Sequence, residues 1–132
     1  EEKLISKCIT CLKEGDKIPI HGDGSYIRDW TYVKDNINGI LSIIDNNIKN
    51  NCFNIAANNY LTNIDAARSV IRFMEGPTDL SVGDEYIKFV EDRWGQDVRY
   101  SVDISKITEA TGWKPKHNNG LYLDFLNENT AY

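Results

Sequence analysis

The sequence has 132 residues, a mass of 15.1 kDa, and a composition of 41% hydrophobic and 27% charged residues. This composition is typical of a globular segment that forms one domain or part of one. The formal net charge of -5 disfavours a general nucleic-acid or anionic-membrane surface, so an anion site would have to be local. Apolar runs of a few residues are far too short for a membrane span. We therefore expect neither nucleic acid nor a membrane as a partner.

An amphipathic helix is predicted at the beginning of the chain. Apolar residues recur at helical spacing from Leu4 to Leu12, and Gly15 stands where a helix is expected to end. The sequence opens on this pattern without an initiator Met. We therefore expect a piece of a longer protein.

The cysteines are interpreted as buried structural residues. Cys8 and Cys11 fall on one face of the first helix, and no second pair or His cluster accompanies them to complete a zinc site. With Cys52 they make an odd number, which argues against a disulfide framework. The pattern favours a reducing compartment, and we expect a cytoplasmic protein without a bound metal.

The middle of the chain alternates between strand and helix patterns. Residues 17–33 predict a β-hairpin around the turn Gly22-Asp23-Gly24, and residues 33–48 predict a helix with one apolar face. The run CFNIAA, residues 52–57, predicts a strand that is covered on both faces. Because the covering elements are missing from this chain, we expect the segment to be incomplete as a domain.

The second half continues the mixed pattern. Residues 61–74 predict a helix that begins with a capping box at Thr62 and Asp65, followed by a loop over 77–85. Two short strands, 86–90 and 99–102, flank a charged loop. Helices are then predicted over 103–112, ending at Gly112, and over the tail 118–132. This order of elements predicts an α/β or α+β fold.

Catalytic motifs are not found in the sequence. Gly22-Asp23-Gly24 does not form a dinucleotide fingerprint, because Ile27 occupies the third Gly position and a strand follows where a helix should begin. The sequence has no Tyr-x-x-x-Lys pair, no phosphate-binding P-loop and no nucleophile elbow. His21 and His117 are far apart and form no triad. We expect no catalytic residue in this segment.

Several arginines stand at structured positions. Arg28 lies inside the second strand of the predicted hairpin, and its guanidinium fits either a carboxylate or a phosphate. An internal ion pair with Asp29 or Asp35 therefore competes with an anion site. The stretch EDRWGQDVRYSVDISKI, residues 91–107, crowds further charges around one Gly. On the residues alone it is either a solvated turn or an anion-binding loop.

Four stretches carry a resemblance to a known family. GDGSYIRDWTYVKDN, NIAANNYLTNID, FVEDRWGQDVRYSVDISKI and GWKPK, in this order and spacing, resemble the C-terminal half of nucleoside-diphosphate-glucose 4,6-dehydratases. These are extended short-chain dehydrogenases/reductases (SDRs), typified by dTDP-glucose 4,6-dehydratase. The resemblance implies an α/β fold in which residues 1–132 are the C-terminal nucleotide-sugar-binding region. It places NAD and the catalytic residues in an N-terminal half that this chain lacks, and it implies a homodimer for the full-length protein.

The resemblance also implies an activity. NAD oxidises C4 of the sugar, water is lost across C5 and C6, and the hydride returns to C6, which gives a 4-keto-6-deoxyglucose nucleotide. The substrate that the resemblance implies is dTDP-glucose or UDP-glucose. The sequence leaves both bases open, because one methyl group contributes only ~1–3 kcal/mol to discrimination. Two alternatives remain open. One is a non-catalytic nucleotide-sugar-binding remnant, and the other is the same half of another nucleotide-sugar dehydratase or epimerase.

The substrate contacts that the resemblance implies come from several parts of the chain. Arg28 and the loop 92–96 are expected to meet the diphosphate, and His21 is expected to lie against the nucleobase. Trp94 and Gln96 stand where the family has Pro and His, so the loop has no φ-locked residue and no titratable ring there. The full set of expected contacts is Lys3, Leu4, Ile5, Pro19, Ile20, His21, Arg28, Asn63, Asp92, Arg93, Trp94, Gly95 and Gln96.

Overall fold

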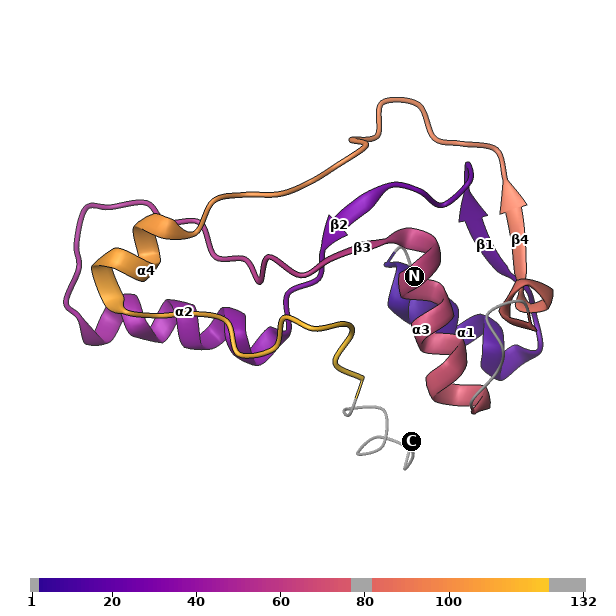
Figure 1. The fold of residues 1–132 in the computed structure, drawn as a ribbon, viewed down its shortest axis with the longest axis horizontal. Helices are drawn as coiled ribbons and strands as arrows, with labels where there is room; N and C mark the ends of the chain where they lie inside the picture. The colour runs from indigo at the N-terminus through magenta and orange to yellow at the C-terminus, as the bar shows by residue number, and fades with distance from the viewer. Residues whose placement is uncertain (1–2, 77–81, 124–132) are drawn as a thin grey trace. The chain divides into compact units, whose positions relative to one another are not determined.

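The computed structural model describes residues 3–76 and 82–123, which form two compact units (Figure 1). Among the described residues, the first unit consists of 3–27, 61–76, 82–98 and 123, and the second of Arg28–Tyr60 and Arg99–Tyr122. The chain therefore passes from one unit to the other several times. In the described part of the chain, no helix is both long and apolar enough to cross a membrane.

The first unit packs two helices beside a pair of parallel strands. Helix α1 (Leu4–Glu14) packs against α3 (Asn63–Glu75), and strand β1 (Ile18–His21) pairs in parallel with β4 (Ile87–Val90) (Figure 1). The 3₁₀ helix η1 (Val82–Tyr86) leads into β4. The buried apolar side chains of this unit include Cys8, Cys11, Ile18, Ile20, Ala66, Ala67, Val70, Ile71 and Ile87.

The caps of both helices agree with the sequence pattern. α1 ends at Gly15, whose φ of 74° is left-handed and whose N–H bonds back to the last turn. α3 begins after Thr62, whose side-chain oxygen accepts the N–H of Asp65 at 3.1 Å. Thr62 in turn donates to the Asp65 carboxylate at 2.6 Å. The predictions of these two helices are confirmed.

The predicted hairpin is wrong, although both of its strands form. β1 pairs with β4, and β2 (Ile27–Asp29) pairs with β3 (Tyr60–Thr62). The Gly-Asp-Gly turn is present, with φ of 61° at Gly22 and 76° at Gly24. Because β1 finds a parallel partner far along the chain, this turn leads away from β1 instead of folding back on it.

The second unit is built around two helices. α2 (Val33–Asp45) and α4 (Ser105–Thr111) contact each other, which confirms both predicted helices. Gly39 allows a close approach, because a Cβ there would lie 3.0 Å from Ile55 Cγ2 and 3.3 Å from Trp113 Cε2. The buried core of this unit is Ala56, Ile104, Ile107 and Trp113, packed by Ile43, Phe53, Ile55 and Val102.

Two predicted strands of this unit are also wrong. Residues 52–57 and 99–102 are extended but belong to no sheet, apart from an isolated bridge at Arg99. The backbone N–H groups of Ala57, Asn58 and Asn59 donate to the Asp29 carboxylate at 2.9–3.2 Å. A side chain thus takes the place of a neighbouring strand at the end of the CFNIAA run.

The remaining predictions fall partly outside the described residues. Of the loop 77–85, residues 77–81 lie outside them, and 82–86 form the 3₁₀ helix. Of the predicted tail helix 118–132, residues 124–132 lie outside them as well. Residues 118–123 are not helical, which corrects that part of the prediction.

The apolar face of α2 is exposed. Val33, Ile37, Ile40, Leu41 and Ile44 are 47–61% exposed, whereas Asp35 and Gly39 on the other side of the helix are buried. A contiguous row of large aliphatic side chains on a helix is a surface that normally contacts another element.

We expect the isolated 132-residue chain to bind a hydrophobic dye or to self-associate, because this α2 face is exposed. Fluorescence of an added anilinonaphthalene dye and light scattering are the measurements. The double substitution Ile37→Lys and Ile44→Lys should lower both signals. Val98→Lys, which removes one exposed apolar side chain elsewhere, is the control. A dye-silent monomer would contradict the expectation.

The cysteines differ in environment. Cys8 and Cys11 are buried as predicted, whereas Cys52 is exposed, so the prediction of burial is wrong for Cys52. Burial, and to a lesser extent the neighbouring Cys11, raises the pKa of the Cys8 thiol from 9.0 to about 12. A thiol with such a pKa holds almost no reactive thiolate at neutral pH.

At pH 8 an alkylating reagent should therefore modify Cys52 at least about 100-fold faster than Cys8. Peptide mass spectrometry over a time course measures the two rates. Adding urea should bring them together, because unfolding removes the burial that raises the pKa of Cys8. Equal rates in the folded protein would show that Cys8 is accessible.

Candidate functional site

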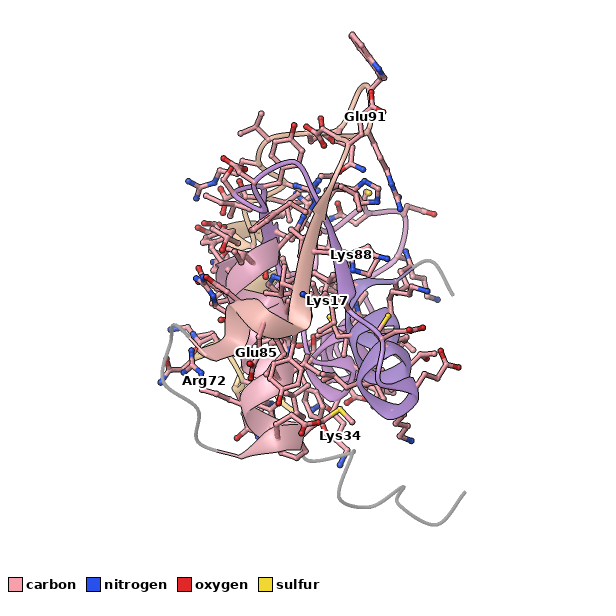
Figure 2. All side chains as sticks on the ribbon, turned by 90° about the vertical axis from the view of Figure 1, so that its right-hand side faces the viewer. Lys17, Lys34, Arg72, Glu85, Lys88 and Glu91 are labelled. Atoms are coloured by element: carbon pink, nitrogen blue, oxygen red, sulfur yellow. The ribbon has the colours of Figure 1, made fainter. Side chains whose placement is uncertain are left out.

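The site begins where the two parallel strands of the first unit end. His21 stands opposite Val90 in the register, and the N–H of Gly22 donates to the Val90 carbonyl at 3.1 Å. The turn after β1 and the loop after β4 therefore start side by side. Figure 2 shows Glu91 at this end of β4, and Lys17, which precedes β1, toward the other end. In α/β proteins the carboxyl ends of parallel strands are where ligands bind.

A cavity of about 180 Å³ opens at this end of the strands. Pockets for whole small molecules measure roughly 300–1,000 Å³, so this cavity suits one portion of a larger ligand. The described residues around it include two cations and no carboxylate, although the chain is acidic overall. The lining residues are Leu4, Lys7, Pro19, Ile20, His21, Asn63, Arg93 and Gln96.

Backbone contacts fix the start of α3, which carries Asn63 into the cavity wall. The Asn63 N–H donates to the Tyr26 carbonyl at 3.0 Å, and the Ile64 N–H donates to the Gly24 carbonyl at 3.1 Å. Gly24 has to be glycine here, because a Cβ would lie 2.8 Å from both Ile20 Cγ2 and Ile64 Cβ. The turn after β1 thus determines where the Asn63 side chain lies.

Asp92 anchors the loop that follows β4. Its carboxylate accepts the Tyr26 hydroxyl and the Arg93 N–H, the latter at 2.8 Å. The same carboxylate lies against Gly22, where a Cβ would come within 3.3 Å of it. Because these contacts occupy the carboxylate, Asp92 fixes the backbone from which Arg93 projects.

Arg93 reaches from this loop to β1. Its Nε lies 3.0 Å from His21 Nε2, and the other ring nitrogen of His21, Nδ1, lies 2.9 Å from the Glu91 carbonyl oxygen. Farther along the loop Gly95 has a φ of 78°, and Trp94 is 98% exposed at the tip. A second hollow under the loop is lined by Tyr26, Glu91, Asp92, Arg93, Trp94, Gly95 and Gln96.

The structure brings most of the expected contact residues together. Those at one cavity are Leu4, Pro19, Ile20, His21, Asn63, Arg93 and Gln96, and Asp92, Trp94 and Gly95 lie on the adjoining loop. Lys3 is the exposed N-cap of α1, and Ile5 is half-buried on that helix. Arg28 belongs to the other unit, where it is half-buried on β2.

Lys7 is the lining residue that the sequence did not predict. It lies one helical turn after Leu4 and four residues after Lys3, so the helical periodicity of α1 places it on the same face as these expected contacts. That spacing was the available signal. Its ammonium is a second cation in the lining of the cavity, in addition to the Arg93 guanidinium.

The described ranges contain no group of three or more His, Cys, Asp or Glu side chains placed to hold a metal ion. Asp35, the buried carboxylate among the described residues of the second unit, has other partners. Asp35 accepts the backbone N–H groups of Lys116 and His117 at 3.0 and 2.8 Å, and His117 Nδ1 lies 3.0 Å from it.

Solved structures establish the class of protein. The chain superposes on the dTDP-glucose 4,6-dehydratase of Bacillus anthracis, solved in complex with NAD, with a TM-score of 0.72 and 31% identity over 89% of this chain and 35% of that one. For the dTDP-glucose 4,6-dehydratase of Streptomyces venezuelae, solved with NAD and a further ligand bound, the TM-score is 0.78, with 29% identity over 96% of this chain and 37% of that one. The α/β, Rossmann-type fold class of extended SDRs is thereby confirmed.

The family follows from a sequence model. The model described as GDP-mannose 4,6 dehydratase matches residues 1–120, and the chain belongs to this family. Among curated relatives, the dTDP-glucose 4,6-dehydratase of Escherichia coli is 32% identical over 120 residues, which cover 87% of this chain and 33% of that protein. The chain thus spans about a third of the length of the relatives that it matches.

Proposed function

We propose that residues 1–132 are the C-terminal nucleotide-sugar-binding region of an NAD-dependent 4,6-dehydratase. Its substrate is dTDP-glucose or UDP-glucose, and its products are the 4-keto-6-deoxyglucose nucleotide and water. The observation that carries the proposal is the cavity beyond β1 and β4, where Lys7 and Arg93 provide positive charge and no described lining residue is a carboxylate. In a chain with a net charge of -5, such a local reversal of charge favours an anionic ligand.

The lining residues divide the work of binding. Arg93 and Lys7 neutralise the diphosphate, and the planar guanidinium of Arg93 matches two phosphate oxygens at once. Asn63 and Gln96 offer amide groups to hydroxyls of the ribose or the sugar, while Leu4, Pro19 and Ile20 form an apolar wall. Arg28 is a further diphosphate contact in this proposal, and the imidazole faces of His21 lie against the base.

This region contributes to the reaction by binding and orienting the substrate. Binding energy from the diphosphate and base holds the glucose unit in one orientation toward the cofactor. This lowers the entropic part of the activation barrier. NAD would be held by residues outside this chain and, when bound, would supply the hydride chemistry at C4 and C6 of the sugar. Residues of the loop 92–96 and of α1 line the cavity that would hold the diphosphate.

The surroundings of the region are part of the proposal. The exposed α2 face supports an incomplete domain, because a row of aliphatic side chains of that size is normally covered. The covering element would be the N-terminal NAD-binding and catalytic half, through which the full-length protein forms a homodimer. The three free cysteines support a cytoplasmic location.

The experiment compares the 132-residue chain with the complete gene product that contains it. Each is incubated with NAD and dTDP-glucose or UDP-glucose, and the 4-keto product is measured. We expect product from the complete protein and none from residues 1–132 alone. Product from the short chain would contradict the proposal that NAD binding and catalysis need residues outside 1–132. A complete protein that binds the nucleotide-sugars without turnover would favour the non-catalytic remnant.

A further inference from the structure

His21 lies between the cavity and the loop that follows β4, and both of its ring nitrogens are engaged. Nδ1 lies 2.9 Å from the carbonyl oxygen of Glu91, and Nε2 lies 3.0 Å from Nε of Arg93. The ring is half-buried and lines the cavity. A single side chain on β1 therefore connects two successive parts of the loop.

The partners indicate which ring nitrogen donates and which accepts. A carbonyl oxygen can only accept a hydrogen bond, so Nδ1 carries a proton and donates it to Glu91. The guanidinium Nε–H can only donate, so Nε2 has no proton and accepts from Arg93. In this arrangement His21 donates from Nδ1 and accepts at Nε2.

The bond to His21 restrains an exposed arginine. Arg93 projects from a loop whose residues 91–95 are all exposed, and its backbone N–H donates to the Asp92 carboxylate. A free arginine side chain loses much rotational freedom when it binds a ligand, and a prior restraint removes part of that cost. Because the bond uses Nε, the two terminal amino groups keep their ability to bind a phosphate oxygen pair.

We propose that His21 is a positioning residue, whose imidazole holds the Arg93 guanidinium in place for the diphosphate. This inference rests on the proposed function, in which Arg93 binds that group. It differs from stacking against the base, because stacking uses the faces of the ring and positioning uses its edge. The two roles are therefore separable by substitution.

Two variants distinguish the role of the His21 aromatic ring from the role of its hydrogen-bond acceptor. His21→Gln keeps an oxygen that accepts the Arg93 Nε–H and loses the aromatic ring, whereas His21→Phe keeps the ring and loses the acceptor. Two probes separate the parts of the ligand. Inorganic diphosphate has no base, so a ring cannot stack on it, and dTDP carries both groups.

The test is calorimetric titration of the complete gene product and its variants with each probe. His21→Phe should bind both probes about 2–10-fold more weakly than the wild type, the range expected when one restrained side chain becomes free. His21→Gln should bind inorganic diphosphate within about 2-fold of the wild type. The amide spectrum of each variant verifies the fold. In His21→Phe the Arg93 Nε–H resonance should broaden or shift toward the chemical shift of a solvent-exposed arginine. In His21→Gln it should do neither.

The outcomes distinguish this inference from the proposed function. A wild-type protein that binds neither probe would overturn the proposed function and the positioning role together. A wild-type protein that binds diphosphate, with Arg93→Ala impaired and His21→Phe unimpaired, would overturn the positioning role alone. An unchanged Arg93 Nε–H resonance in His21→Phe would also overturn it.

Discussion

Replacing Arg93 with alanine should weaken binding of dTDP to the complete protein about 10–150-fold. A hydrogen bond to a charged group contributes about 1.5–3 kcal/mol, and each 1.4 kcal/mol corresponds to a factor of ten in affinity. Arg93 lines the cavity from a loop that Asp92 anchors, so its loss removes a cation without removing a core contact. Calorimetric titration of the wild type and the variant measures the difference.

Lys17→Ala is the matched control for this prediction. It removes the same charge from an exposed position before β1, toward the opposite end of the strand from His21 (Figure 2). Screening at physiological salt confines an exposed charge to about 8 Å, so the control should change affinity by less than about 2-fold. If both variants lost affinity equally, the effect of Arg93 would be one of net charge, and the cavity would not be the binding site.

Arg28→Ala is expected to weaken dTDP binding by the same 10–150-fold. Arg28 lies on β2, half-buried in the second unit. Its alternative role is an internal ion pair within the protein. Unchanged affinity together with a lowered melting temperature would identify that alternative, so titration and thermal unfolding are both measured.

Replacing Asp35 with alanine should lower the free energy of unfolding by about 3–5 kcal/mol. The carboxylate is 1% exposed and binds two backbone N–H groups and the His117 ring. Removing it takes the acceptor away from three part-buried contacts, and an unsatisfied buried donor costs about 1–3 kcal/mol. Urea unfolding measures the change.

Two further variants make the result specific. Asp35→Asn retains one acceptor oxygen and should lose roughly half as much stability. Asp45→Ala removes an exposed carboxylate from the end of the same helix and should be within about 0.5 kcal/mol of the wild type. A loss below about 1 kcal/mol for Asp35→Ala would show that the Lys116 and His117 amides find other partners.

Local sequence signals predicted α1 to α4, although residues 118–123 of the predicted tail helix are not helical. α1, α2, α3 and α4 follow from apolar periodicity, and Gly15 and Gly112, both left-handed at the helix ends, mark two of the stops. These signals lie within one or two helical turns of sequence. Nothing outside the segment has to be known in order to read them.

Strand pairing was predicted poorly because partners are chosen at long range. The Gly22-Asp23-Gly24 turn favours a local hairpin, yet β1 and β4 pair across about 70 residues of sequence. The CFNIAA run is apolar like a buried strand, but the N–H of its last residue, Ala57, and those of the two residues after it bind the Asp29 carboxylate. No local pattern reveals that a carboxylate 28 residues earlier will occupy them.

The site was predicted from family resemblance more than from physics. From spacing alone, the segment around Arg93 could be either a solvated turn or an anion-binding loop. The resemblance favoured the anion-binding loop. The structure adds the contacts that no motif contains, namely Asp92 to Tyr26 and His21 to Arg93. Lys7 could have been found from helical periodicity once Leu4 was expected at the site.

The central claim is that the cavity at the ends of β1 and β4 binds the nucleoside diphosphate. Titrating dTDP into the isotopically labelled complete protein and following backbone amide shifts tests it most directly. The account predicts saturable shifts at residues 18–22, 63 and 91–96, and their loss in Arg93→Ala. Saturable shifts confined to other residues, or no shifts at millimolar dTDP, would contradict it.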